Sequence, residues 1–128
     1  MIIRKLSKIK KIPASHEDQQ NPGCLKRIIF KKEEIPENYR IQMINWAVIP
    51  EKRSFRPHYH TDMYEIFILI KGKARISVDK KTFNLVQGDT VLISPNSVHS
   101  MANTGDSVLE YYVIGLSGSL KGKTVNLE

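Results

Sequence analysis

Residues 58–72 read HYHTDMYEIFILIKG, a stretch that combines a metal-ligating pattern with a buried strand. His58 and His60 are two positions apart, so both side chains leave the same face of an extended strand. A reversal is expected at residues 61–63, which would bring the carboxylate of Glu65 back beside the two histidines from the adjacent strand. Residues 66–70 are apolar at every position, which is typical of a central strand covered on both faces.

A third histidine joins this group from a later stretch, residues 88–103, which reads GDTVLISPNSVHSMAN. His99 enters after the turn at Pro95. Three imidazoles and one carboxylate suit Mn, Fe, Ni, Co or Zn as divalent ions. Histidines on a strand are also found buried and hydrogen-bonded to the backbone without a metal, but a buried carboxylate without a cation is costly to desolvate. We therefore predict that one divalent transition-metal ion per subunit is bound by His58, His60, Glu65 and His99.

The rest of the chain has the pattern of short strands separated by turns, without a convincing helix. Strands are expected at residues 25–30, 40–49, 64–70, 74–78, 82–86, 90–93, 98–103 and 108–114. Turn residues separate them at 71–72, 79–81, 87–89 and 94–96. Residues 2–12 suit either a short amphipathic helix or an irregular arm packed on the sheet, and we favour the arm. Regularly spaced strands of this kind predict a β-sandwich or barrel.

The two quoted stretches resemble the two sequence motifs of the cupin superfamily. The first matches H-x-H, Glu and Gly at every spaced position, and the second matches at Gly88, His99 and Asn103. Ser94 replaces the proline of the second motif and Asn96 its glycine, an exchange that the turn tolerates because asparagine adopts positive φ readily. The resemblance implies an all-β double-stranded β-helix, the jelly-roll barrel, with an N-terminal arm. We expect a basic arm and linker over residues 1–24, the cupin barrel over residues 25–116 and a C-terminal tail over residues 117–128.

The charge of the chain lies mainly outside the predicted barrel. The 128 residues carry a formal net charge of +7, and residues 1–11 hold five basic and no acidic residues. No helix-turn-helix accompanies this basic segment, so we expect no nucleic-acid partner. The longest apolar run is too short for a membrane helix and no secretory signal begins the chain, so we expect a cytoplasmic protein without a membrane partner. Cys24 and His16 are interpreted as bystanders in a polar linker.

The resemblance implies a site more clearly than a reaction, because cupins with this ligand set differ widely in chemistry. Our first hypothesis is a metal-dependent isomerase, lyase or dioxygenase that acts on a carbohydrate-like or other oxygen-rich small molecule by Lewis-acid activation. The alternative is a non-catalytic, metal-dependent binding or sensor module for a sugar or similar ligand. The candidates for a catalytic acid or base are Tyr64, Glu110 and Tyr112. They rest on placement alone, so we assign no catalytic residue. The doubly apolar strand at residues 65–70 predicts a homodimer whose partner covers its outer face.

Overall fold

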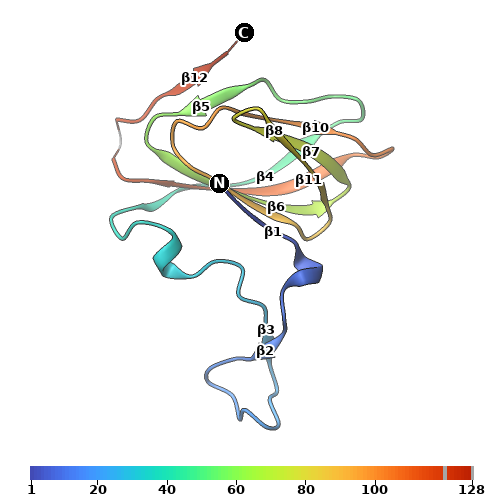
Figure 1. Cartoon of the computed structure of the whole chain (residues 1–128), viewed down its shortest axis with the longest axis vertical. Coiled ribbons are helices and arrows are strands. Elements are labelled where there is room, and N and C mark those ends of the chain that lie inside the picture. Colours follow the sequence, from blue (N-terminus) through green and yellow to red (C-terminus); the bar gives the residue numbers. More distant parts are fainter. Residues whose placement is uncertain (120, 128) are drawn as a thin grey trace.

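Two five-stranded antiparallel sheets face each other and form the barrel of the protein (Figure 1). The computed structural model describes residues 1–119 and 121–127. The first sheet contains, in spatial order, β1 (Ile2–Arg4), β9 (Thr90–Ile93), β6 (Met63–Lys71), β11 (Leu109–Ser117) and β4 (Arg40–Ile49). The second sheet contains β12 (Thr124–Asn126), β5 (His58–His60), β10 (His99–Asn103), β7 (Lys73–Val78) and β8 (Lys81–Val86). The predicted all-β jelly-roll class is confirmed.

The core lies between the two sheets because each strand turns alternate apolar side chains inward. In β7, Ala74, Ile76 and Val78 are buried. β6 lies at the centre of the first sheet, between β9 and β11, as its uninterrupted apolar sequence predicted. Phe67 and Leu69 of β6 are among the core residues that meet those of the second sheet.

Tight turns between the strands use the backbone conformations that the sequence indicated. Asp79 and Lys80 both have positive φ, 48° and 71°, in the hairpin between β7 and β8. Asn96 has a φ of 67°, so the asparagine in the second motif adopts the conformation expected of the glycine that it replaces. The turn before His99 therefore survives the exchange.

The N-terminal segment begins as a strand of the barrel and then leaves it. β1 pairs with β9, with Ile3 opposite Val91. Beyond it the chain passes η1 (Leu6–Lys8) and projects away from the barrel as a small hairpin of β2 (Ile12–Pro13) and β3 (Leu25–Lys26) (Figure 1). An N-terminal arm is thus present, but residues 2–4 form a regular strand of the sheet where we expected an irregular segment. The strand predicted over residues 25–30 is only two residues long. Among the described residues, 27–30 have no strand partner, and Ile28 is exposed.

The chain returns from the hairpin along the outer face of the first sheet. The Arg4 guanidinium forms an ion pair with Glu34, in η2 (Lys32–Glu34), and lies 5.5 Å from the centre of the Phe30 ring. Residues of this returning segment therefore cover the β1 side of the outer face, whereas the β4 side is left open.

The C-terminal segment pairs with the strand that carries two of the predicted ligands. Thr124 lies opposite His60 and Asn126 opposite His58 in the β12–β5 pair. Strands β1 and β12 thus extend the two sheets with residues outside 25–116. No helix among the described residues is long and apolar enough to cross a membrane.

Candidate metal centre

Four side chains converge at one end of the barrel interior. His58, His60, Glu65 and His99 each offer one ligand atom, and these atoms all lie within 4.8 Å of one another. His58 and His60 leave the same face of β5, as the spacing predicted, and His99 of β10 lies directly opposite His58 in the neighbouring strand. The four residues predicted as ligands therefore come together.

Glu65 approaches the histidines by a different route from the one that the sequence suggested. We expected its carboxylate to come from the strand next to the histidines. β5 and β6 instead belong to opposite sheets, because the chain crosses the barrel at residues 61–62. Glu65 therefore faces the imidazoles across the barrel interior. Hydrophobic periodicity predicts which face a residue lies on but not which sheet its strand joins.

Backbone carbonyls determine the tautomer of two of the histidines. Nδ1 of His58 donates to the carbonyl oxygen of Arg56 at 2.7 Å, and Nδ1 of His99 donates to that of Ser97 at 2.9 Å. A carbonyl oxygen only accepts, so both Nδ1 atoms carry a proton. In the neutral ring, the lone pair is then on Nε2, which points into the cluster.

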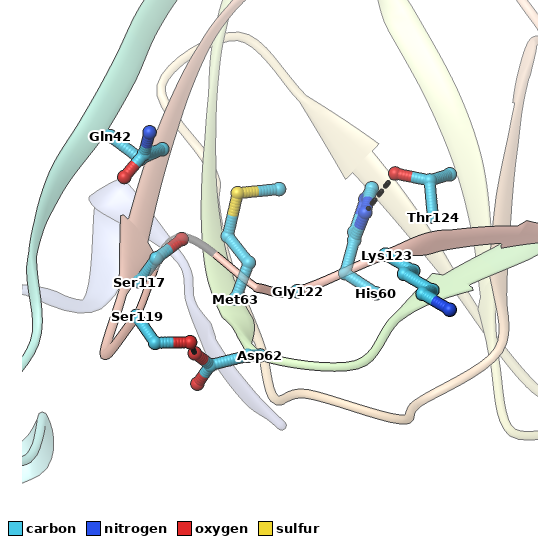
Figure 2. A pocket seen from close by; sticks show the side chains of 9 residues that line it. All are labelled: Gln42, His60, Asp62, Met63, Ser117, Ser119, Gly122, Lys123 and Thr124. Atoms are coloured by element: carbon cyan, nitrogen blue, oxygen red, sulfur yellow. Dashed lines mark hydrogen bonds between the residues drawn. The ribbon is translucent and has the colours of Figure 1, made fainter.

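The third histidine is held by a side chain. Nδ1 of His60 lies 2.8 Å from the Thr124 hydroxyl oxygen (Figure 2). Its Nε2 atom is buried, lies 3.0 Å from Oε1 of Glu65 and has no directional hydrogen-bond partner among the described residues. A buried nitrogen without a hydrogen-bond partner, held 3.0 Å from a carboxylate oxygen, fits a cation that binds to both atoms.

The electrostatics of the cluster keep Glu65 ionised. Burial alone would raise the pKa of its carboxyl group, but the imidazoles of His60 and His99, whose Nε2 atoms both lie 3.0 Å from Oε1, outweigh burial and lower the pKa to about 2. Burial lowers the pKa of the His58 imidazole below its usual value of 6.5, because burial disfavours the charged form of the ring. A carboxylate and neutral imidazoles are the protonation states that bind metals.

The donor atoms fit a divalent cation. Nε2 of His99 lies 3.0 Å from Oε1 of Glu65. Because Nδ1 of the neutral ring holds the proton, a lone pair would face a carboxylate oxygen, and this contact is stable only with a cation or a second proton between the two atoms. Three nitrogens and one oxygen are donors for Mn, Fe, Co, Ni or Zn ions.

A polar cavity of about 140 Å³ lies beside His60 (Figure 2). It is lined by Gln42, His60, Asp62, Met63, Ser117, Ser119, Gly122, Lys123 and Thr124. Asp62 accepts hydrogen bonds from the hydroxyl groups of Ser119 at 2.6 Å and Tyr39 at 3.2 Å. Sequence reasoning missed this cavity, because most of its wall comes from residues 117–124, which we expected to form a tail.

Other residues singled out in the sequence lie away from the cluster. Glu110 and Tyr112 are on the outer face of β11, where Glu110 accepts a hydrogen bond from Trp46 Nε1 at 3.0 Å. Tyr64 packs edge-on against Tyr39, with ring centres 5.0 Å apart. His16 is exposed and contacts Glu17, and Cys24 is exposed. The placement of Glu110 and Tyr112 rules both out as groups within reach of the cluster.

The barrel agrees with a comparison against known families. A cupin-domain model matches residues 45–115, more than half of the chain. The chain belongs to the cupin family. This cupin is 35% identical over 85 residues to the alginate biosynthesis protein AlgA of Pseudomonas aeruginosa, a match that covers 66% of this chain and 17% of AlgA. It is 28% identical over 69 residues to the uncharacterized protein MJ1618 of Methanocaldococcus jannaschii, covering 54% and 55% of the two chains. The chain thus spans about half the length of one curated relative and under a fifth of the other.

Solved structures share the barrel. A cupin protein from Bacteroides fragilis is 26% identical with a TM-score of 0.56, and the match covers 62% of this cupin and 70% of that chain. Bacillus subtilis oxalate decarboxylase, a protein with Mn(II) centres, is 26% identical with a TM-score of 0.58, covering 66% and 23%. A sugar phosphate isomerase from Silicibacter pomeroyi has the same fold at 17% identity, with a TM-score of 0.59 and coverage of 66% and 55%.

Proposed function

We propose that this cupin binds one divalent transition-metal ion through Nε2 of three histidines and the carboxylate of Glu65. We further propose that it is a metal-dependent enzyme of isomerase, lyase or dioxygenase type that acts on a small, oxygen-rich molecule. One observation carries the proposal: the four ligand atoms lie within 4.8 Å of one another beside a polar cavity. An octahedral ion with four protein ligands would keep two positions for substrate oxygens or water.

The bound ion, Glu65 and the residues of the adjacent cavity would have separate roles in the proposed reaction. The bound ion would act as a Lewis acid toward a carbonyl or hydroxyl oxygen. Glu65 stays a carboxylate at neutral pH because its pKa is about 2. Gln42 and Ser117 line the adjacent cavity with amide and hydroxyl groups that hydrogen-bond to an oxygen-rich molecule and orient it.

The similar proteins support a sugar derivative or a small carboxylic acid as the substrate class. AlgA acts in alginate biosynthesis, and the oxalate decarboxylase contains Mn(II) centres. The Silicibacter pomeroyi sugar phosphate isomerase supports the fold alone.

A second candidate function is metal-dependent binding of such a ligand without turnover. The placement of Glu110 and Tyr112 on the outer face favours it, because a turnover mechanism needs an acid or base near the reacting atoms. Asp62 is an ionisable group in the cavity wall, and its two hydroxyl partners lower its pKa and hold it as a carboxylate. Product formation from a sugar phosphate or a dicarboxylic acid by the metal-loaded protein would favour the enzyme over the binding module.

Metal analysis tests the site directly. Protein purified without added metal is compared with the His58→Ala/His60→Ala double variant and with His16→Ala, which removes an exposed histidine outside the cluster. We expect about one metal ion per chain in the wild-type protein and in His16→Ala, and far less in the double variant. Equal metal content in all three proteins would refute the site.

We also propose that the protein is a homodimer, with its partner on the β4 side of the first sheet. The expected surface on residues 65–70 is not available, because Ile66 is only 9% exposed within the chain. Open apolar side chains lie instead on β4 and β11, at Ile44, Trp46, Val48 and Tyr112.

The exposed fractions of these four side chains range from 38% to 61%. Since a fully exposed large apolar side chain offers about 150–250 Å², together they expose roughly 400 Å² of apolar surface. This is about half of the ~800 Å² that each partner buries in a stable dimer. Residues 41–49 are uncharged and β4 is an edge strand, so a second copy meets it without charge repulsion. We expect light scattering to give a dimer for wild-type protein and for Val86→Glu on β8, and a monomer for Trp46→Glu. A wild-type monomer at micromolar concentration would refute this assembly.

A further inference from the structure

We infer that the C-terminal strand β12 is part of the metal centre, where Thr124 is a positioning residue for His60. The inference rests on the proposed function, in which His60 is a metal ligand. It concerns residues outside the matched cupin domain, which ends at residue 115.

Thr124 is unlike the partners of the other two histidines. His58 and His99 donate to carbonyl oxygens from residues two positions earlier in their own chain segments. The only protein partner of His60 Nδ1 among the described residues is the Thr124 hydroxyl, 64 positions away in the sequence, at 2.8 Å. His60 therefore depends on a distant segment for an interaction that its two neighbours obtain locally.

The position of Thr124 is determined by strand pairing. Thr124 lies directly opposite His60 in the antiparallel β12–β5 pair, so the two side chains share one face of the sheet. Two reciprocal bonds hold the strand there: Thr61 N donates to the Lys123 carbonyl at 2.9 Å, and Lys123 N donates to the Thr61 hydroxyl at 2.8 Å. Leu127 N adds a bond to the Pro57 carbonyl at 2.9 Å.

The hydroxyl affects the metal through the imidazole ring. When it accepts the proton of Nδ1, the Nε2 lone pair of His60 points toward Glu65, where the ion would lie. Outer partners of this kind orient a ligand and typically contribute about 10- to 100-fold in metal affinity. Thr124 is exposed, so water replaces part of the lost bond when the hydroxyl is removed. We therefore expect an effect of about tenfold, at the lower end of that range.

Three full-length variants test the inference. Thr124→Val removes the hydroxyl at nearly constant shape, Thr124→Ser keeps it, and Thr61→Val removes a hydroxyl that holds the same segment without touching His60. Metal-stripped proteins are titrated with Zn²⁺ alone against a chelator, thermal unfolding monitors stability, and the ¹⁵N shifts of the His60 ring are measured by NMR.

We expect Thr124→Val to bind Zn²⁺ about tenfold more weakly and to change the His60 ring shifts. Thr124→Ser and Thr61→Val should stay near wild-type affinity. Wild-type Zn²⁺ affinity in Thr124→Val would overturn the inference. An equal loss of affinity in Thr61→Val would also overturn it, because the loss would then come from weaker pairing of β12 with β5. A wild-type protein that binds no Zn²⁺ would instead overturn the proposed function. If Thr124→Val fails to fold, Thr124→Ala takes its place in the same comparison.

Discussion

The Nζ atom of Lys5 lies 2.8 Å from Oδ2 of Asp89, 84 positions later in the sequence. The Asp89 side chain is only 3% exposed, and it also accepts a 2.8 Å hydrogen bond from Val86 N. Lys5 donates in addition to the carbonyl oxygen of Asn84. Part of the basic character of the N-terminal segment therefore ties that segment to the barrel between β8 and β9.

The Lys5–Asp89 pair should contribute measurably to stability. A double-mutant cycle with Lys5→Met and Asp89→Asn, followed by urea unfolding, isolates the interaction. We expect a coupling of about 1 kcal/mol, because Asp89 is buried but Lys5 is 40% exposed and screened by solvent. Additive effects of the two substitutions would contradict a stabilising ion pair.

Metal binding should stabilise the folded chain and depend on Glu65. A ligand that binds only the folded state at 100 times its Kd adds about 2.7 kcal/mol to the free energy of unfolding. We expect added Zn²⁺ or Mn²⁺ to raise the Tm of metal-stripped wild-type protein, a chelator to reverse the rise, and Glu65→Gln to remove most of it. Glu51→Gln, at an exposed position, is the control, and a Tm rise retained in Glu65→Gln would speak against Glu65 as a ligand.

The metal-free protein should lose stability in acid. The pKa of Glu65 is about 2 in the folded chain against an ordinary value of 4.5. A lowered carboxyl pKa contributes stability that is present above pH 4.5 and is lost as the pH falls toward 2, by about 3 kcal/mol in all. Burial also lowers the pKa of His58, so protonation of the unfolded chain below pH 6.5 acts in the same direction. Unfolding free energies measured from pH 7 to pH 3 should fall less steeply for Glu65→Gln than for wild-type protein. Equal slopes of unfolding free energy against pH in the two proteins would show that Glu65 is not the source of the acid sensitivity.

The turn between β6 and β7 should require glycine. Gly72 has a φ of 99°, and a Cβ atom there would lie 3.1 Å from backbone atoms of Val108 and Leu109. We expect Gly72→Ala to cost about 2 kcal/mol in chemical denaturation, because both the conformation and the contact are unfavourable. Gly105→Ala is the matched control, since its Cβ would meet no atom closer than 3.6 Å. Equal stabilities of the two variants would show that the turn relaxes.

Local patterns in the sequence predicted much of the barrel and the composition of the cluster. Alternation in residues 74–78 and the apolar run at residues 66–70 correspond to β7 and β6, because burial on one or both faces selects side chains position by position. The spacing of His58 and His60 placed both rings on one face, since side chains on a strand repeat every two residues. Asn96 at positive φ was predictable for the same reason, because it depends on a single residue.

Relations between distant segments were decided by the tertiary structure. Which sheet a strand joins depends on packing of the whole barrel, so the chain itself did not indicate that Glu65 faces the histidines from across the interior. Three-residue strands such as β1 and β12 carry too few side chains to show a period, and their pairing depends on partners tens of positions away. The sequence by itself thus determined which residues contribute the nitrogen and oxygen atoms of the cluster. Only folding brought Thr124 to His60 and Lys5 to Asp89, because those contacts arise from strand pairing and chain crossing rather than from any local pattern.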